Sequence, residues 1–268
     1  MFNTSMKISS ENAVSGQYPF SGNNHLIRGS VITEDARRRI EPEGFVLIRG
    51  NRLAMPDNLA QGIAEFRSSW TNLIEDPYLP NGSRHRFRRY SRFTFDPITG
   101  DLKQNADTSF YQSRTINRVA GGIAREFAPL EEMIREGDIL RSLIRFDFSL
   151  LSISDSIKLC AWDVNVHQIR IVGSYGVDGS PTPEGVHRDG HMFVGQHLIH
   201  RENVEGCVSV VCHDNGSPFD AALLAERFDS IIVDDLKIKH FASPIKPLVS
   251  DLPAIRDMLL IDFHCPLP

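Results

Sequence analysis

The sequence predicts an α+β protein whose second half is a β-sandwich or barrel. Helical spacing of apolar residues dominates the stretch before residue 155, and short apolar runs separated by turns dominate the stretch after it. With 268 residues, of which 41% are hydrophobic and 24% charged, the chain can bury a core of one large unit. We therefore expect a loose lead-in over residues 1–25, which are rich in Ser, Asn and Gly, and a single domain over residues 26–268.

The first expected strand is the apolar run at residues 44–50, which lies between two glycines. Apolar residues then recur at helical spacing over residues 63–73, which predicts a helix. Residues 84–95 alternate arginine with aromatic residues and lead into a turn sequence at residues 96–100. That pattern predicts a hairpin.

The stretch from Ile116 to Leu151 is expected to be helical, because one apolar face recurs through it at the spacing of an α-helix. Pro129 is expected to divide it into two helices. Beyond residue 155 we expect six strands, each bounded by turn residues. They are Val164–Val172, Gly185–Phe193, Val208–Cys212, Ser230–Val233, Leu236–Ala242 and Met258–Phe263.

Three residues of this second half form the most informative pattern in the chain: His187, Asp189 and His240. On an extended segment His187 and Asp189 would point to the same face, since strand residues alternate sides. A histidine from a distant strand can complete two imidazoles and one carboxylate, the usual ligand set of non-haem Fe(II) oxygenases. Alternation over residues 236–242 places His240 on the same apolar face as Leu236 and Ile238, directed inward.

A lone guanidinium accompanies this pattern. Arg256 shares a strand face with Met258 and Leu260, and a buried arginine is costly unless it meets an anion. Guanidinium groups bind carboxylates through two parallel hydrogen bonds. The combination suits a dicarboxylate co-substrate, bound by a metal at one end and by Arg256 at the other.

Composition excludes several classes of function. The net charge of −5 gives no general attraction to nucleic acid or to anionic membranes. The four cysteines form no CxxC pair, which suits a reducing compartment. No apolar run approaches the roughly 20 residues that a membrane helix needs, and residues 1–18 contain no apolar leader segment. We expect a cytoplasmic protein that acts on a small molecule and binds neither nucleic acid nor membrane.

Several motifs, in this order, resemble the iron- and 2-oxoglutarate-dependent dioxygenases of the L-isoleucine 4-hydroxylase type. They include PEGVHRDGH at residues 183–191, QHLI at 196–199, HFASPI at 240–245 and RDMLLIDF at 256–263. The resemblance extends over about residues 40–263.

The resemblance implies a double-stranded β-helix, a jelly-roll or cupin-like core with supporting N-terminal helices. It also implies that His187, Asp189 and His240 hold Fe(II) and that Arg256 binds the far carboxylate of 2-oxoglutarate. O2 would be the second co-substrate, with ascorbate as a reductant in vitro. Members of the family hydroxylate free amino acids and release succinate and CO2. Because Asp189 stands where related halogenases have a small residue, the resemblance favours hydroxylation over chlorination.

Other functions stay open at this stage. The same iron site could act on a carrier-tethered or peptidyl amino acid, or catalyse desaturation or cyclisation. A binding module without iron and a zinc hydrolase built on the same three residues are the alternatives of other classes. The amino acid, the carbon hydroxylated, its stereochemistry and the oligomeric state are not determined by the sequence.

Further residues are candidates for supporting roles. A substrate carboxylate could bind one of the basic residues Arg86, Arg88, Arg89, Arg92 or Arg170. His191 is expected to line the pocket without binding the metal. His167 and His197 are interpreted as core histidines or as donors that support the metal ligands.

Overall fold

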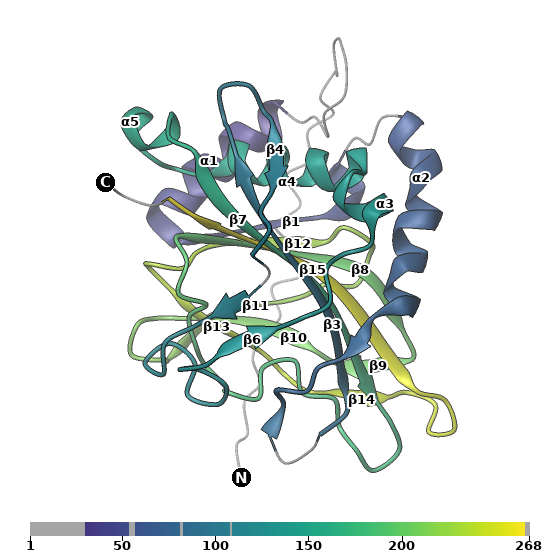
Figure 1. The fold of residues 1–268 in the computed structure, drawn as a ribbon. Coiled ribbons are helices and arrows are strands. Elements are labelled where there is room, and N and C mark those ends of the chain that lie inside the picture. The colour runs from purple at the N-terminus through teal and green to yellow at the C-terminus, as the bar shows by residue number, and fades with distance from the viewer. Residues whose placement is uncertain (1–29, 54–56, 81–82, 108, 266–268) are drawn as a thin grey trace.

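The core of the protein is an eight-stranded antiparallel sheet that combines strands from both halves of the chain (Figure 1). The computed structural model describes residues 30–53, 57–80, 83–107 and 109–265. The lead-in expected at residues 1–25 lies outside them. The order of the strands is β1-β12-β8-β15-β7-β3-β2, and β4 pairs with β3. The α+β class predicted from the sequence is confirmed.

Helices and strands alternate unevenly along the chain. The helical segments are α1 (Ser30–Glu43), η1 (Gly50–Arg52), α2 (Asp57–Ser68), η2 (Ser69–Asn72), α3 (Glu132–Arg135), α4 (Asp138–Leu150) and α5 (Asp155–Lys158). The strands of the large sheet are β1 (Phe45–Ile48), β2 (Ile74–Glu75), β3 (Arg86–Phe95), β4 (Leu102–Gln104), β7 (Trp162–Gly173), β8 (Phe193–Glu202), β12 (Ser230–Asp234) and β15 (Ala254–His264). The remaining strands are β5 (Ser109–Tyr111), β6 (Ala124–Glu126), β9 (Val204–Gly206), β10 (Val208–Cys212), β11 (Pro218–Leu223), β13 (Lys239–Ala242) and β14 (Ile245–Pro247).

One face of the large sheet is apolar and is covered by helices. Phe93, Val164 and Phe263 lie side by side across β3, β7 and β15. They share a buried hydrophobic cluster with Leu140 and Leu143 of α4, and residues of α1 and α2 belong to the same cluster. Figure 1 shows these helices along one side of the sheet. Burial of this cluster supplies the main apolar stabilisation of the fold.

The opposite face of the sheet is much more polar. Because strand residues alternate, the neighbours of the apolar set point the other way. There Tyr90, His167 and Leu260 lie side by side, with Arg88 one step further along β3. The small sheet β11-β10-β13 lies on this side, since Val211 of β10 packs with Met258 of β15 in a second hydrophobic cluster. The space between the two sheets therefore holds both apolar and charged side chains.

The helix expected from Ile116 is wrong over its first half. Residues 124–126 form strand β6, which pairs with β5, and helix begins only at Glu132. Gly122 has a φ of +83°, a left-handed conformation that a continuous right-handed helix excludes. Val119 and Ile123 of the expected apolar face are instead exposed. The apolar spacing was fortuitous, because the paired glycines at 121–122 interrupt it.

Two strands near the metal pattern also differ from expectation. Residues 185–192 are irregular apart from a single β-bridge at His187, and the strand begins at Phe193. Gly190, with a φ of +85°, breaks the extended conformation. Residues 235–237 form a turn that exposes Leu236, so only the segment Lys239–Ala242 of the expected strand is in a β-strand. Strand β8 was not anticipated at all, because its apolar run contains several polar residues.

The other expected elements are confirmed within a few residues. Strand β1, helix α2, the β3–β4 hairpin, β7, β10, β12 and β15 all lie where the sequence predicts them. Asp96 stabilises the hairpin turn by accepting hydrogen bonds from the backbone N–H groups of Ile98 and Thr99. The four cysteines all lie in the described part of the chain, and none of them forms a disulfide. Within the described part of the chain, no helix is long and apolar enough to cross a membrane.

A buried polar link fastens helix α4 to the large sheet. Asp147 and His197 are both fully buried, with 2.8 Å between Asp147 Oδ2 and His197 Nε2. His197 Nδ1 lies 2.7 Å from the hydroxyl of Ser230 on the next strand. Gly195 is required here, because a Cβ at that position would lie 2.2 Å from Asp147 Oδ2. His197 is therefore a core histidine, as the sequence suggested.

This link yields a prediction about stability. Asp147→Ala leaves the buried His197 nitrogen without a partner, so we expect the free energy of unfolding to fall by about 3 kcal/mol. Asp147→Asn keeps an acceptor at the same place and should cost clearly less. Urea denaturation followed by circular dichroism measures both. Equal losses in the two variants would contradict the idea that the hydrogen bond itself carries the effect.

Candidate metal centre

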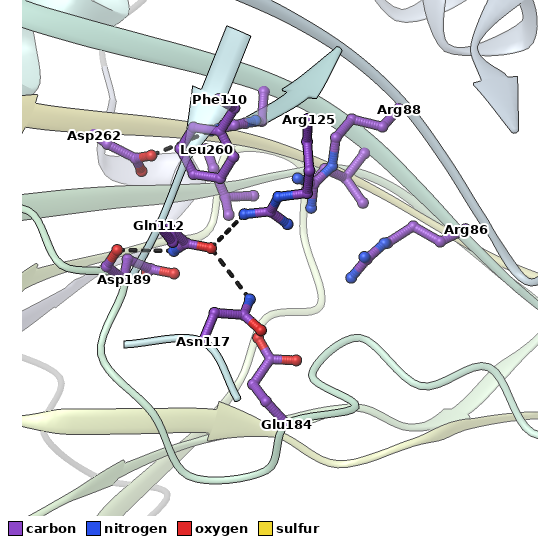
Figure 2. Close-up of a pocket in the computed structure, with 12 residues that line it drawn as sticks. Arg86, Arg88, Phe110, Gln112, Asn117, Arg125, Glu184, Asp189, Leu260 and Asp262 are labelled. Atoms are coloured by element: carbon purple, nitrogen blue, oxygen red, sulfur yellow. Dashed lines mark hydrogen bonds and ion pairs between the residues drawn. The ribbon is translucent and has the colours of Figure 1, made fainter. Parts of the chain in front are cut away.

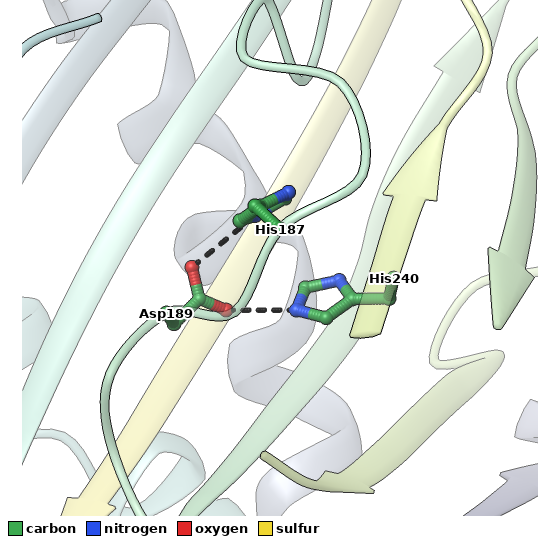
Figure 3. A group of neighbouring side chains, drawn as sticks. All are labelled: His187, Asp189 and His240. Carbon is green, nitrogen blue, oxygen red and sulfur yellow. Dashed lines mark hydrogen bonds and ion pairs between the residues drawn. The ribbon is translucent and has the colours of Figure 1, made fainter. Parts of the chain in front are cut away.

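Two imidazoles and one carboxylate converge at the edge of the space between the sheets (Figure 3). His187 Nε2 lies 3.5 Å from Asp189 Oδ1, and His240 Nε2 lies 3.1 Å from Asp189 Oδ2. One ligand atom from each residue lies within 4.8 Å of the others. Around an ion with bonds of about 2.1 Å, donors at right angles lie about 3 Å apart. The spacing of these three side chains fits a single cation.

Backbone pairing brings the two histidines together. His187 and His240 form an isolated antiparallel bridge, with N–H···O distances of 3.0 and 2.9 Å in the two directions. The bridge joins the loop before β8 to strand β13, two segments that are far apart in the sequence. Left-handed glycines at 185 and 190 let the loop turn sharply on either side of His187 and Asp189. His187 and Asp189 were expected to share the face of a strand. Instead, a short loop that is bridged to β13 brings their side chains together.

The orientation of each imidazole leaves one nitrogen for a metal. His187 Nδ1 lies 2.9 Å from the carbonyl oxygen of Gly185, so it donates its hydrogen there, and Nε2 is the nitrogen that would bind a metal on losing its proton. His240 Nδ1 lies 3.1 Å from Gln196 Nε2. A half-turn of the carboxamide would present its oxygen to this nitrogen instead, and His240 Nε2 would then be free to bind a cation.

A second carboxylate, that of Asp235, fixes the loop that bears Asp189. Asp235 accepts hydrogen bonds from the backbone N–H groups of Asp189, Gly190 and His191, at 3.0, 2.7 and 3.2 Å. Its side chain is 1% exposed, and Oδ1 lies 3.8 Å from His240 Nε2. Burial and the nearby charge of Asp189 raise the pKa of this carboxyl group. Asp235 therefore holds the backbone of the loop that carries Asp189, and with it the position of this carboxylate.

The protonation equilibria of the three residues are strongly perturbed. Burial lowers the pKa of His187, but the hydrogen bond and charge of Asp189 outweigh it and raise the pKa to about 9. Burial raises the pKa of Asp189, but hydrogen bonds and charges of both histidines hold it well below its usual range. A cation would compete for the same lone pairs, so its binding releases protons. The carboxylate is ready to bind a cation across the whole neutral range.

Arg256 lies inward on β15, as the sequence predicted, and it has no counter-ion among the described residues. It is 3% exposed, and its Nε and Nη2 atoms have no hydrogen-bond partner. The two aspartates that could have neutralised it are directed elsewhere. Asp257 pairs with Arg170 at 2.7 Å, and Asp262 lies 3.2 Å from His167. Burying a guanidinium without a counter-ion is costly, and an anionic ligand would offset that cost.

A polar pocket opens beside the metal ligands (Figure 2). Asp189 is part of its wall, and Arg86 and Arg88 of β3 line it from the large sheet. Asp76 accepts a 2.8 Å hydrogen bond from Arg86 Nε, and Arg88 Nε lies 3.7 Å from the same oxygen. Burial raises the pKa of Asp76, but the charges of Arg88 and Arg86 more than reverse this. Arg86 is thus neutralised, whereas Arg88 shares a carboxylate that is already engaged.

The hairpin β5–β6 closes the pocket from the other side. Gln112, directly after β5, donates a 2.8 Å hydrogen bond to the carbonyl oxygen of Asp189. Its own oxygen accepts from Arg125 Nη2 at 2.5 Å and from Asn117 Nδ2 at 3.1 Å. Arg125 also stacks over the ring of Phe110, with 4.7 Å to the centroid. This chain of contacts links the loop of the metal ligands to a second buried guanidinium.

The remaining sequence-predicted candidates lie outside this pocket. Arg170 pairs with Asp257 on the helix-covered face, and Arg92 pairs with Asp163 at 2.7 Å. Arg89 donates to the backbone carbonyl oxygens of Asn72 and Pro129. Only Arg86 and Arg88 of the five arginines therefore line the pocket.

Two further histidines lie close to the pocket, and both contact Asp262. His167 lines the pocket and His191 lies next to it, each with Nε2 within 3.4 Å of Asp262. Burial raises the pKa of Asp262 to about 7, although the charge of His191 opposes the shift. Burial and the charge of Arg88 lower the pKa of His167 well below its usual range, so its imidazole is neutral.

Sequence reasoning missed several residues of the site. Arg125 escaped notice because residues 116–128 were expected to form a helix, and Gln112 because no element was predicted over residues 101–115. Asp235 precedes an expected strand, and only the three-dimensional contact with the loop at Asp189 reveals its role. Glu184, another pocket residue, lies three positions before His187 in the PEGVHRD motif. That proximity was the one available signal.

Comparison with protein families gives a match to the family described as 2OG-Fe dioxygenase, over residues 67–262. A curated relative, the 3(1)-hydroxy-L-isoleucine 4-dioxygenase of Pantoea ananatis, is 26% identical over 232 residues. The alignment covers 83% of this chain and 92% of the relative.

Solved structures agree with the fold. A bsmA homolog from Methylobium petroleophilum is 27% identical, with a TM-score of 0.76, over 87% of this chain and 93% of the other. The crystal structure of IDO from Bacillus thuringiensis is 20% identical, with a TM-score of 0.74, over 88% of this chain and all of the other. The second likeness concerns the fold alone.

The contacts of Asp235 generate a prediction about metal affinity. Asp235→Asn replaces one carboxylate oxygen by an N–H donor that opposes the backbone N–H groups of the Asp189 loop. We expect the affinity for Fe(II), measured anaerobically by calorimetry, to fall by about tenfold to a hundredfold.

Asp234→Asn is the matched control, because that neighbouring side chain contacts Leu236 and Lys237 instead. It should leave the affinity near that of the wild type. An Asp235→Asn protein with undiminished affinity would show that the loop is positioned without this carboxylate.

Proposed function

The chain belongs to the 2OG-Fe dioxygenase family, and on this premise we propose that it hydroxylates an unactivated C–H bond of a free L-amino acid or a close derivative. Fe(II), 2-oxoglutarate and O2 take part, and succinate and CO2 are released. The observation that carries the proposal is the convergence of His187, Asp189 and His240 on one open-sided centre. The family match extends across all three positions.

The similarity to a relative named for a dioxygenase reaction on a hydroxylated isoleucine supports the amino-acid part of the proposal. At 26% identity it supports the substrate class and leaves the particular amino acid open. Asp189 bears on the reaction type, because a carboxylate at this position occupies space that a bound halide would need. Hydroxylation is therefore favoured over chlorination.

The residues of the site would share the work as follows. His187, Asp189 and His240 would hold Fe(II) from one side, and Asp235 would keep Asp189 in place. Bound iron with 2-oxoglutarate supplies the activation of O2 and the oxidation of the C–H bond. The protein orients the co-substrates, excludes bulk water from the space between the sheets, and positions the substrate beside the metal.

Arg256 is the proposed partner of the far carboxylate of 2-oxoglutarate. Its guanidinium is buried and unpaired on the face of β15 that points into the space between the sheets. Binding a carboxylate there would offset the cost of burying the positive charge of Arg256. The planar fork of donors also fixes the direction in which a dicarboxylate extends toward the metal.

We further infer that the two facing sheets form the double-stranded β-helix expected of the family, with α1, α2 and α4 as outer support. The single domain expected over residues 26–268 stays a prediction. In its favour, strands β1, β2 and β3 join the same sheet as β7, β8, β12 and β15.

The proposal is tested by succinate formation across the free L-amino acids with Fe(II), 2-oxoglutarate and ascorbate. Substrate-dependent turnover with one or a few of them is the expected result. Turnover confined to carrier-tethered or peptidyl amino acids would favour the related alternative. An anaerobic titration without a visible charge-transfer band would favour a binding module, and activity independent of O2 would favour a zinc hydrolase.

A variant series at Arg256 follows from the proposed co-substrate site. Arg256→Met should raise the KM for 2-oxoglutarate by about tenfold to a hundredfold, the effect of losing hydrogen bonds to a charged group. Arg256→Lys keeps the positive charge but loses the planar pair of donors, so its KM for 2-oxoglutarate should lie between those of the wild type and Arg256→Met. Initial rates of succinate formation give the KM. An unchanged KM in Arg256→Met would place the far carboxylate elsewhere.

A further inference from the structure

We propose that Arg88 and Arg125 bind the free carboxylate of the substrate and that Glu184 binds its ammonium group. The substrate would then be an α-amino acid whose carboxylate is neither esterified nor amidated. This inference rests on the proposed function and deepens it, because it names the residues that distinguish a free amino acid from a tethered one.

The pocket that contains these groups adjoins the metal centre directly. Arg88, Arg125 and Glu184 share its wall with Asp189 (Figure 2). Gln112 connects the two regions, since it contacts both the backbone of Asp189 and the guanidinium of Arg125. A small molecule bound here therefore lies next to the oxidising centre.

Two of the three arginines in the pocket wall have no carboxylate of their own. Asp76 is engaged at 2.8 Å by Arg86, which leaves Arg88 with a contact of 3.7 Å to the same oxygen. Arg125 has the neutral amide of Gln112 as its hydrogen-bond acceptor. One carboxylate placed between Arg88 and Arg125 would supply a charged partner for both.

Both guanidiniums also have unused donors. Arg88 and Arg125 are 8% and 2% exposed, and the Nε atom of each is buried without a hydrogen-bond partner. Burial and the charge of Arg86 lower the pKa of Arg88 to about 9. They also lower the pKa of Arg125. An anion would relieve both costs, since it supplies the missing acceptor and the missing charge.

Glu184 supplies the opposite charge on the other side of the pocket. Figure 2 shows its carboxylate directed toward Asn117, across the opening from Arg125. No ion pair joins Glu184 to Arg88 or Arg125, and its Oε1 atom lies 3.7 Å from His187 Nε2. A pocket with two guanidiniums on one side and a separate carboxylate on the other matches the two charges of a zwitterionic amino acid.

The co-substrate is a less suitable ligand for this pocket. In the register of the large sheet, Arg88 is level with Met258, whereas Arg256 is level with Arg86. Two strand spacings separate β3 from β15, which corresponds to about 10 Å. The protein therefore presents two distinct cationic positions, one for each of the two anions that the reaction requires.

The consequence concerns the form of the substrate. A carrier-tethered or peptidyl residue lacks a free carboxylate, so it would leave Arg88 and Arg125 unpaired in a buried place. Loss of hydrogen bonds to charged groups of this kind reduces binding by about tenfold to a hundredfold for each group.

The test compares one amino acid with two of its analogues. The best amino acid of the free L-amino acid panel is assayed beside its C-terminal amide and its desamino acid, with KM and kcat separated. Wild-type protein should prefer the acid to the amide by at least a hundredfold. In Arg88→Met and Arg125→Met this preference should collapse, with the KM for 2-oxoglutarate unchanged. In Glu184→Gln the preference over the desamino acid should collapse instead.

Arg92→Met is the matched control. It removes a guanidinium from the same strand, where the side chain pairs with Asp163 outside the pocket. Its preferences should equal those of the wild type. A purely structural role of Arg88 or Arg125 would lower activity on acid and amide alike, so the ratio of the two values of kcat/KM would not move.

The outcomes separate this inference from the proposed function. Turnover of the amide at the rate of the acid, or a raised KM for 2-oxoglutarate in Arg88→Met, would overturn the inference and leave the dioxygenase intact. If no amino acid is turned over, calorimetry of the same panel against wild type and Arg88→Met decides. Binding that is lost in Arg88→Met but kept in Arg92→Met would support the carboxylate site, and binding of none would refute it.

Discussion

The central strand β15 sets the constraint on which the other features of this structure depend. It pairs along its length with β7 on one side and β8 on the other, so its alternation is imposed on the whole sheet. Phe263 and Ile261 face the helices, while Arg256 and Asp262 face the space between the sheets. A shift by one residue would bury charges under α4 and expose the apolar set. The same pairing that stabilises the core therefore directs the polar chemistry inward.

This arrangement buries charged side chains, some with a partner of opposite charge and some without one. Behind the sheet, Asp147 meets His197 and Asp257 meets Arg170, so each carboxylate has a partner. In front of it, Arg256 stays without one among the described residues. Completed pairs hold the fold together, and incomplete ones mark positions where a ligand would be stabilised. The face toward the small sheet also contains a completed pair, Arg86 with Asp76, so Arg256 differs from its own neighbours as well.

The metal ligands illustrate how short-range and long-range contacts cooperate. Asp189 and His187 are close in sequence, but their loop is shaped by left-handed glycines and by the carboxylate of Asp235. His240 arrives through two backbone hydrogen bonds to His187. Because the loop is held by backbone contacts on both sides, the ligand geometry does not depend on the flexibility of long side chains. Gln112 connects this loop to the neighbouring pocket, because it donates a hydrogen bond to the backbone carbonyl oxygen of Asp189.

The sequence alone determined the α+β class, most strands of the large sheet, and the identities of the three metal-binding candidates and Arg256. These follow from period-two alternation and from a rare combination of residue types, which local patterns express. It did not determine the irregular loop at residues 185–192, the β5–β6 hairpin, or the roles of Arg125 and Asp235. Apolar spacing over residues 116–134 imitated a helix, because periodicity does not register the left-handed glycine that ends it. Which charges are neutralised, and which await a ligand, was decided only when strands distant in sequence were brought side by side.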